Sequence, residues 1–141
     1  MIKMIIDANE MILGRIATKA AKAALLGEKV DIVNCEKSVI TGNKAQILAR
    51  YKQRRDRGTH STGPFFPRMP DRFVKRVVRG MLPYKQPKGR DAFKRVTCHV
   101  GVPEEFNDQK MESFKEAHIS KLPSNKFVFV KVICKFIGAK I

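Results

Sequence analysis

The apolar residues of this chain fall alternately into short strand-like runs and longer stripes with helical spacing. Met4–Ile6 is a brief apolar run of the kind that forms a buried strand, and Val30, Ile32 and Val33 predict a second strand. Between them, from Leu13 to Ala24, apolar residues recur on one helical face, and Gly27 follows where a left-handed C-cap belongs. The first part of the chain therefore predicts a strand, a helix and a second strand.

The alternation continues to the end of the chain. A Thr-Gly-Asn turn follows residues 39–40 and is a typical N-cap for a helix that runs towards Arg57. Residues 96–100 alternate as a half-buried strand does, residues 127–130 predict a last strand, and residues 132–137 predict a short helix. Strands and helices that alternate in this way favour one α/β domain over residues 1–141, with a mostly parallel sheet covered on both faces.

The helix predicted over residues 71–82 separates apolar and cationic residues onto opposite faces. Its apolar positions have helical spacing, and so do the cations opposite them, which are Arg72, Lys75, Arg76 and Arg79. A charged helix face is most often simply solvated. Here, however, the four cations repel one another, and Asp71, before Lys75, is the single acid four residues from any of them, whereas an ordinary solvated face mixes both signs.

Charge is concentrated in the middle of the chain. The protein has 141 residues and a formal net charge of +16. Residues 44–95 contain sixteen Lys or Arg and only three acids, and they hold ten of the eleven arginines. Arginine binds phosphate through two parallel hydrogen bonds and stacks on bases. The composition therefore predicts a polyanionic partner, either nucleic acid or an anionic membrane surface.

Composition also restricts the class of protein. With 43% hydrophobic residues the chain can bury a real core, so it is not a disordered basic tail. The sequence contains no apolar stretch of about 20 residues and no signal peptide, so we expect a soluble cytosolic protein. Cys35, Cys98 and Cys134 are widely spaced among apolar neighbours, and we interpret them as reduced core thiols.

Two connectors in the basic region carry much of its charge. Residues 58–70 have no apolar period and end in two adjacent aromatics, Phe65 and Phe66, which are either core residues or a stacking platform. We expect His60 in this connector to contact phosphate or base. Residues 83–90, constrained by two prolines, predict a stiff basic arm. The acidic stretch 104–116 should face away from any polyanion.

Signs of catalytic chemistry are weak. The sequence contains no dinucleotide-binding, P-loop or nucleophile-elbow motif and no zinc spacing. The turn Thr41–Lys44 can present free N–H groups to an anion. Asp7, at the end of the first strand, is the best candidate for a catalytic acid, and Asp31 or Glu36 could join it. Nothing places a base beside a nucleophile, so Asp7 is better explained as a structural acceptor.

Several blocks of residues resemble one known family. Val77–Pro83, followed by Lys88–Arg90, closely resembles the signature of the L-thirteen family of large-subunit ribosomal proteins. Ile5–Ala8, Leu13–Ala17 and Val33–Lys37 are similar to that family's N-terminal blocks. Residues 65–70 and 136–140 resemble its archaeal branch, whereas residues 104–116 match least well.

The resemblance implies a fold and a function. It implies a three-layer α/β/α fold around a four-stranded parallel sheet, and a structural constituent of the large subunit that binds and organises rRNA without catalysis. The family's basic block falls on Arg79, Lys85, Lys88 and Arg90. The implied partners are large-subunit rRNA and neighbouring ribosomal proteins in the cytoplasm, with no membrane, small-molecule substrate, cofactor or metal.

Two other functions remain open from the sequence: an RNA-processing or nucleotide-dependent enzyme, and a basic nucleic-acid binder unconnected with ribosomes. For the preferred function, the RNA-contacting residues that we predict are cations and one histidine of the basic region 44–95. They are Arg54, Arg55, Arg57, His60, Arg68, Arg72, Lys75, Arg76, Arg79, Lys85, Lys88, Arg90, Lys94 and Arg95.

Overall fold

Three parallel strands form the main sheet of the computed structural model, which describes residues 2–141. Their bounds are β1 Lys3–Asp7, β2 Lys29–Val33 and β4 Val96–Cys98, in the order β1-β2-β4. Ile6 pairs with Ile32, and Ile32 with Cys98, so alternate residues of all three strands face the same side. The strands predicted at the N-terminus and after residue 95 are confirmed, although β4 ends at Cys98.

Two further strands form a separate antiparallel pair, β3 (Val39–Thr41) with β5 (Phe127–Phe129). The α/β class and the small, mostly parallel sheet are confirmed, but its strands do not form one four-stranded sheet. Asn34 follows β2 with a positive φ of 57°, and a 3-10 helix, Cys35–Lys37, comes next. This turn directs the chain out of the main sheet before β3 begins.

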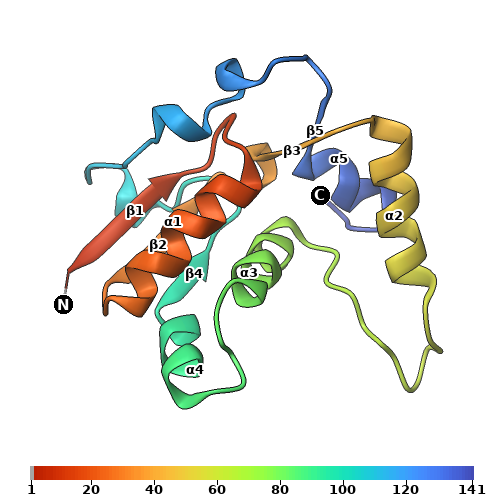
Figure 1. The fold of residues 1–141 in the computed structure, drawn as a ribbon, viewed down its shortest axis with the longest axis horizontal. Coiled ribbons are helices and arrows are strands. Elements are labelled where there is room, and N and C mark those ends of the chain that lie inside the picture. Colours follow the sequence, from red (N-terminus) through yellow and green to blue (C-terminus); the bar gives the residue numbers. More distant parts are fainter. Residues whose placement is uncertain (1) are drawn as a thin grey trace.

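Three helices pack on one face of the main sheet (Figure 1): α1 (Leu13–Leu25), α3 (Pro70–Gly80) and α4 (Pro87–Lys94). The buried face of α1 is rich in alanine, which allows α3 and the sheet to approach closely. α1 ends as predicted, because Gly27 has a φ of 96° and its N–H donates to the Ala24 carbonyl at 3.1 Å.

The other face of the sheet is covered by irregular chain rather than by an α-helix. Phe106, in the 3-10 helix Glu104–Phe106, packs on Ile5 and Val33. Glu112 then pairs with β1, its N–H donating to the Ile5 carbonyl at 2.7 Å. The acidic stretch 104–116, for which the sequence pattern predicted no helix or strand, therefore forms this layer.

A buried carboxylate also lies on this second face. Asp31 is only 3% exposed, and its Oδ1 lies 3.1 Å from His99 Nε2 while its Oδ2 lies 3.8 Å from Lys3 Nζ. The His99 ring also meets the Phe106 ring edge-on. His99 therefore has a structural role in this layer.

The remaining helices, α2 (Lys44–Asp56) and α5 (Val130–Phe136), pack against each other at one end of the molecule. The predicted N-cap of α2 is confirmed, because Asn43 Oδ1 accepts the Ala45 N–H at 3.0 Å. Within the turn considered for an anion, the Gly42 N–H donates to the Lys126 carbonyl at 2.9 Å. Among residues 2–141, no helix has the length and apolar character needed to cross a membrane.

The region after α3 differs from the prediction of a basic arm. The helix ends at Gly80 rather than at Leu82, and a turn leads directly into α4, which begins at Pro87. Gly89 is buried there, and a Cβ at this position would lie only 1.9 Å from the Pro83 carbonyl oxygen. The absence of a side chain at Gly89 thus allows this segment to fold back on itself.

The three cysteines are buried free thiols, as predicted. Burial raises the pKa of Cys134 to about 12. The pKa of Cys35 is raised as well, first by a hydrogen bond with Cys98 and then by burial. The thiols of Cys35 and Cys134 therefore remain protonated in the folded protein.

We expect stability to fall at alkaline pH because of Cys134. Its folded pKa lies above its unfolded value, so the stabilisation is complete below the unfolded pKa and is lost as pH rises towards about 12. Urea unfolding at pH 8.5 and 10.5 measures this loss. A Cys134→Ala variant should lose less stability over the interval, and an equal loss would contradict the assignment.

The division of α3 into two faces predicts opposite effects of the same substitution. Val78 is 0% exposed, so Val78→Asp buries an unpaired charge and should unfold the domain or cost several kcal/mol. Arg76 is exposed on the same helix, so Arg76→Asp should change the midpoint of thermal unfolding by only a few degrees. Similar losses in both variants, measured by circular dichroism, would contradict the division.

Candidate nucleic-acid interface

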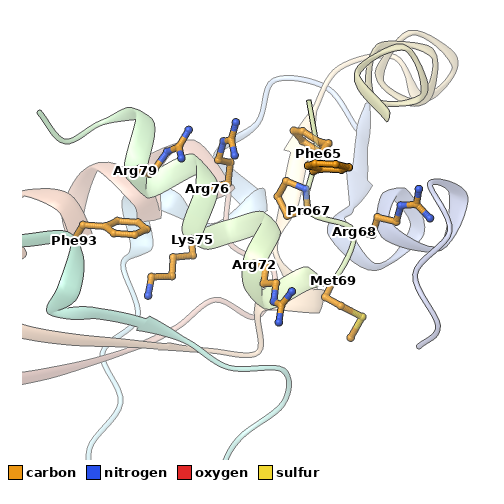
Figure 2. A pocket seen from close by; sticks show the side chains of 10 residues that line it. Phe65, Pro67, Arg68, Met69, Arg72, Lys75, Arg76, Arg79 and Phe93 are labelled. Atoms are coloured by element: carbon orange, nitrogen blue, oxygen red, sulfur yellow. The ribbon is translucent and has the colours of Figure 1, made fainter. Parts of the chain in front are cut away.

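The four cations of α3 line an open groove of about 740 Å³. Arg72 and Arg76 are exposed, and Lys75 and Arg79 are half-buried. Figure 2 shows these side chains along the helix, with Phe93 of α4 at one end and the segment 65–69 at the other. The predicted cationic face of α3 is therefore one wall of a surface groove.

Two smaller grooves adjoin the first. One, of about 350 Å³, is lined by Arg54, Arg57 and Arg76, and the other, of about 430 Å³, by Arg55, Arg57, His60 and Arg68. All three grooves share Phe65 and Phe66. We call the surface formed by these three grooves the basic face. It brings together nine of the fourteen predicted residues, from α2, α3 and the connector between them.

An aromatic cluster supports the basic face from below. Tyr51, Phe66 and Phe73 are in mutual contact, with ring centroids 5.0–5.9 Å apart. The Arg54 guanidinium lies over Tyr51 at 5.3 Å and over Phe66 at 5.9 Å. Burial raises the pKa of Tyr51, against the opposing effect of Arg54 and Arg50, so the phenol stays neutral. The cluster therefore positions Arg54 without neutralising it.

Two more cations of α3 are positioned by aromatic rings. Arg79 lies over Tyr84 at 4.6 Å, and Lys75 lies over Phe93 at 4.8 Å. The Nε atom of Arg79 is buried without a hydrogen-bond partner among residues 2–141. Stacking on rings holds these side chains in place while leaving their positive charge uncompensated.

Acidic groups hardly neutralise the basic face. Of the fourteen predicted residues, Arg55 is the only one in an ion pair within residues 2–141, with Asp56 at 3.1 Å. Asp56 is itself exposed, and exposed pairs contribute at most about 1 kcal/mol. The surface is therefore strongly positive over its whole width, which favours binding of a polyanion.

The other five predicted residues lie apart from the three grooves, on α4 and its flanks. Arg90 donates to the Lys85 carbonyl at 3.0 Å, and Lys88 and Lys94 are exposed. Arg95 donates to the Ala24 carbonyl at 2.9 Å near the end of α1. Arg95 thus has a structural bond, whereas the other four extend the positive surface along α4.

The acids considered for catalysis are all engaged in structural contacts. Asp7 Oδ1 accepts the Asn9 N–H at 3.0 Å and the Asn34 side-chain amide at 2.9 Å. Glu36 accepts the Gly101 N–H at 3.0 Å, and Asp31 faces His99. Within residues 2–141, no group of three or more His, Cys, Asp or Glu side chains is arranged to hold a metal. These contacts give the acids structural roles.

Sequence reasoning left two features of the basic face unresolved. The two aromatics of the connector have different roles, since Phe66 joins the aromatic cluster whereas Phe65 is 69% exposed. The signal was available, because adjacent side chains of an extended segment point to opposite sides. The sequence pattern did not indicate that Phe93 lines the groove, because only the folding of α4 brings its side chain there.

Comparisons with known proteins agree with the resemblance noted above. Residues 2–105 match the family described as ribosomal protein L13. The chain is 46% identical over 96% of its length to a protein named large ribosomal subunit protein uL13 of Methanococcoides burtonii, 98% of which is covered. It is 44% identical to the uL13 protein of Archaeoglobus fulgidus, over 95% of this chain and 86% of that protein. The uL13 protein of Methanocaldococcus jannaschii is 43% identical, over 96% and 98%.

The contacts of Asp7 predict a structural defect when its side chain is removed. Asp7→Ala eliminates two hydrogen bonds, one of them to a part-buried amide, and should lower the free energy of unfolding by about 1–3 kcal/mol. Urea unfolding measures the loss, with Glu105→Ala, at an exposed acid, as the control. Unchanged stability would show that these bonds do not support the turn.

Proposed function

The chain belongs to the ribosomal protein L13 family, and on this premise we propose that it is a structural constituent of the large ribosomal subunit that binds and organises large-subunit rRNA. It acts in the cytoplasm beside other ribosomal proteins. It is not an enzyme, because its relatives are ribosomal proteins of a structural family.

One observation carries the proposal for rRNA: the basic face gathers eight arginine and lysine side chains around three adjoining grooves with little acid beside them. Cations on such a surface neutralise phosphates and release the counterions that surround RNA. The half-buried aromatics beneath them fix their positions, so the protein binds a particular arrangement of phosphates rather than any polyanion.

RNA shape should decide most of this binding. The major groove of an A-form helix is deep and narrow, so its base edges are not accessible to side chains. The basic face is built mainly from point charges and guanidinium groups, which suit phosphates at the junction of RNA segments. We therefore propose that the protein holds rRNA segments together by bridging their backbones.

The two other functions have less support. For an enzyme, Asp7 would have to be free to react, and its carboxylate accepts two hydrogen bonds. A basic nucleic-acid binder unconnected with ribosomes would not explain the similarity to large-subunit proteins over nearly the whole chain. Sedimentation of a cell extract separates these functions, because a ribosomal constituent should co-migrate stoichiometrically with large subunits in high salt.

The proposal predicts a steep salt dependence of rRNA binding. Contacts with six to ten phosphates should give log affinity a slope of roughly −5 to −8 against log salt concentration. Arg72→Ala combined with Arg76→Ala should reduce the slope by about 1–2, as measured by filter binding to a large-subunit rRNA transcript. A wild-type slope near −1 would contradict the electrostatic mechanism.

The control for this pair removes two charges elsewhere. Lys110 and Lys121 are exposed and line none of the three grooves. The variant Lys110→Ala with Lys121→Ala has the same net charge as the Arg72/Arg76 variant and should keep the wild-type slope. Equal reductions in both variants would show that only the net charge matters.

A further inference from the structure

Phe65 is an exposed aromatic side chain in the middle of the basic face. It is 69% exposed, more than any other Phe or Tyr of residues 2–141, whereas its neighbour Phe66 packs against Tyr51 and Phe73. Since Phe66 already supplies the contact with the core, burial within this chain does not account for a second aromatic here. An apolar ring exposed beside so many cations is suited to contact a partner.

The surroundings of Phe65 indicate the chemistry of that partner. Phe65 lines all three grooves, and each two neighbouring grooves share one arginine: Arg76 for the first and second, Arg57 for the second and third, and Arg68 for the first and third. The ring is therefore surrounded by cations. Each nucleotide within a single strand has a flat base with phosphate groups on either side of it. Such a nucleotide matches an exposed aromatic ring surrounded by cations.

A tight turn holds the ring in this position. The Gly63 N–H donates to the Thr59 carbonyl at 3.1 Å, and a Cβ on Gly58 would lie 1.9 Å from the Gly63 carbonyl oxygen. A Cβ on Gly63 would lie 3.1 Å from two atoms of the Phe65 ring, so the ring edge rests against this glycine. The turn thus supports the ring at its edge and leaves it accessible.

Paired bases cannot use such a ring, because their faces are stacked inside the helix and only an unpaired base can be splayed onto an aromatic side chain. We propose that Phe65 stacks on an unpaired base of the bound RNA while Arg57, Arg68 and Arg76 contact the phosphates next to it. This inference rests on the proposed rRNA binding, and it adds a local contact that distinguishes unpaired nucleotides from duplex.

Replacement of the ring by an aliphatic side chain tests the stacking. Phe65→Leu should weaken binding to a large-subunit rRNA transcript by about 5- to 100-fold, the usual contribution of one stacked base. The loss should be the same at every salt concentration, because no charge is removed. Phe136→Leu is the matched control, since Phe136 is 46% exposed and lines none of the three grooves.

Fluorescence gives a second measurement. The chain has no tryptophan, so Phe65→Trp and Phe136→Trp each introduce a single indole. The transcript should quench the indole at position 65 and leave that at position 136 unchanged. Unstructured polyuridine added alone should also quench the indole at position 65, whereas a fully paired RNA duplex, which can bind through its phosphates, should not quench it.

The outcomes separate this inference from the proposed function. Wild-type affinity in Phe65→Leu, absence of quenching at position 65 by the transcript, or equal quenching by polyuridine and by duplex RNA would each refute the stacking. If the salt slope remains steep in these experiments, the proposed rRNA binding stands without it. If the wild-type protein does not bind the transcript at all, both proposals fail together.

Discussion

The burial of one side of α3 determines the arrangement of the candidate interface. Phe73, Val74 and Val78 are almost completely buried in the core, and burying a side chain of this kind contributes about 1.5–3 kcal/mol of hydrophobic stabilisation. Because a helix fixes the angle between its residues, burying these three directs Arg72 and Arg76 outwards. The cations therefore owe their common direction to the core, and a change in the core would move them all.

This arrangement has an electrostatic cost that explains the aromatic rings beside the cations. Like charges three and four residues apart on a helix repel by a few tenths of a kcal/mol per pair. With little acid nearby, Arg79, Lys75 and Arg54 instead lie over rings of Tyr84, Phe93 and Tyr51. The ring faces attract cations without cancelling their charge. A bound polyanion would relieve the remaining repulsion and stabilise the fold by mass action.

Local sequence patterns predicted the parts of the fold that depend on local rules. The stripe and cap of α1, the N-cap of α2 and the two faces of α3 follow from residue spacing. The departure of β3 from the main sheet depends on Asn34, and the pairing of Glu112 with β1 joins distant segments without a periodic signal. Similarly, the cations of α3 were evident from the sequence. The role of Phe93 was not, because it depends on how residues 83–94 fold back on themselves at Gly89.

Under the proposed function, the affinity for RNA and the register of the protein along the RNA depend on different parts of the basic face. Phosphates recur regularly along every RNA helix, so the evenly spaced cations of α3 alone would tolerate a shift along the backbone. A feature that is rare in the RNA must prevent that shift. The connector between α2 and α3 provides a suitable group, because its turn presents one exposed ring between arginines. Helical charges would then supply most of the binding energy, and the connector would select the register.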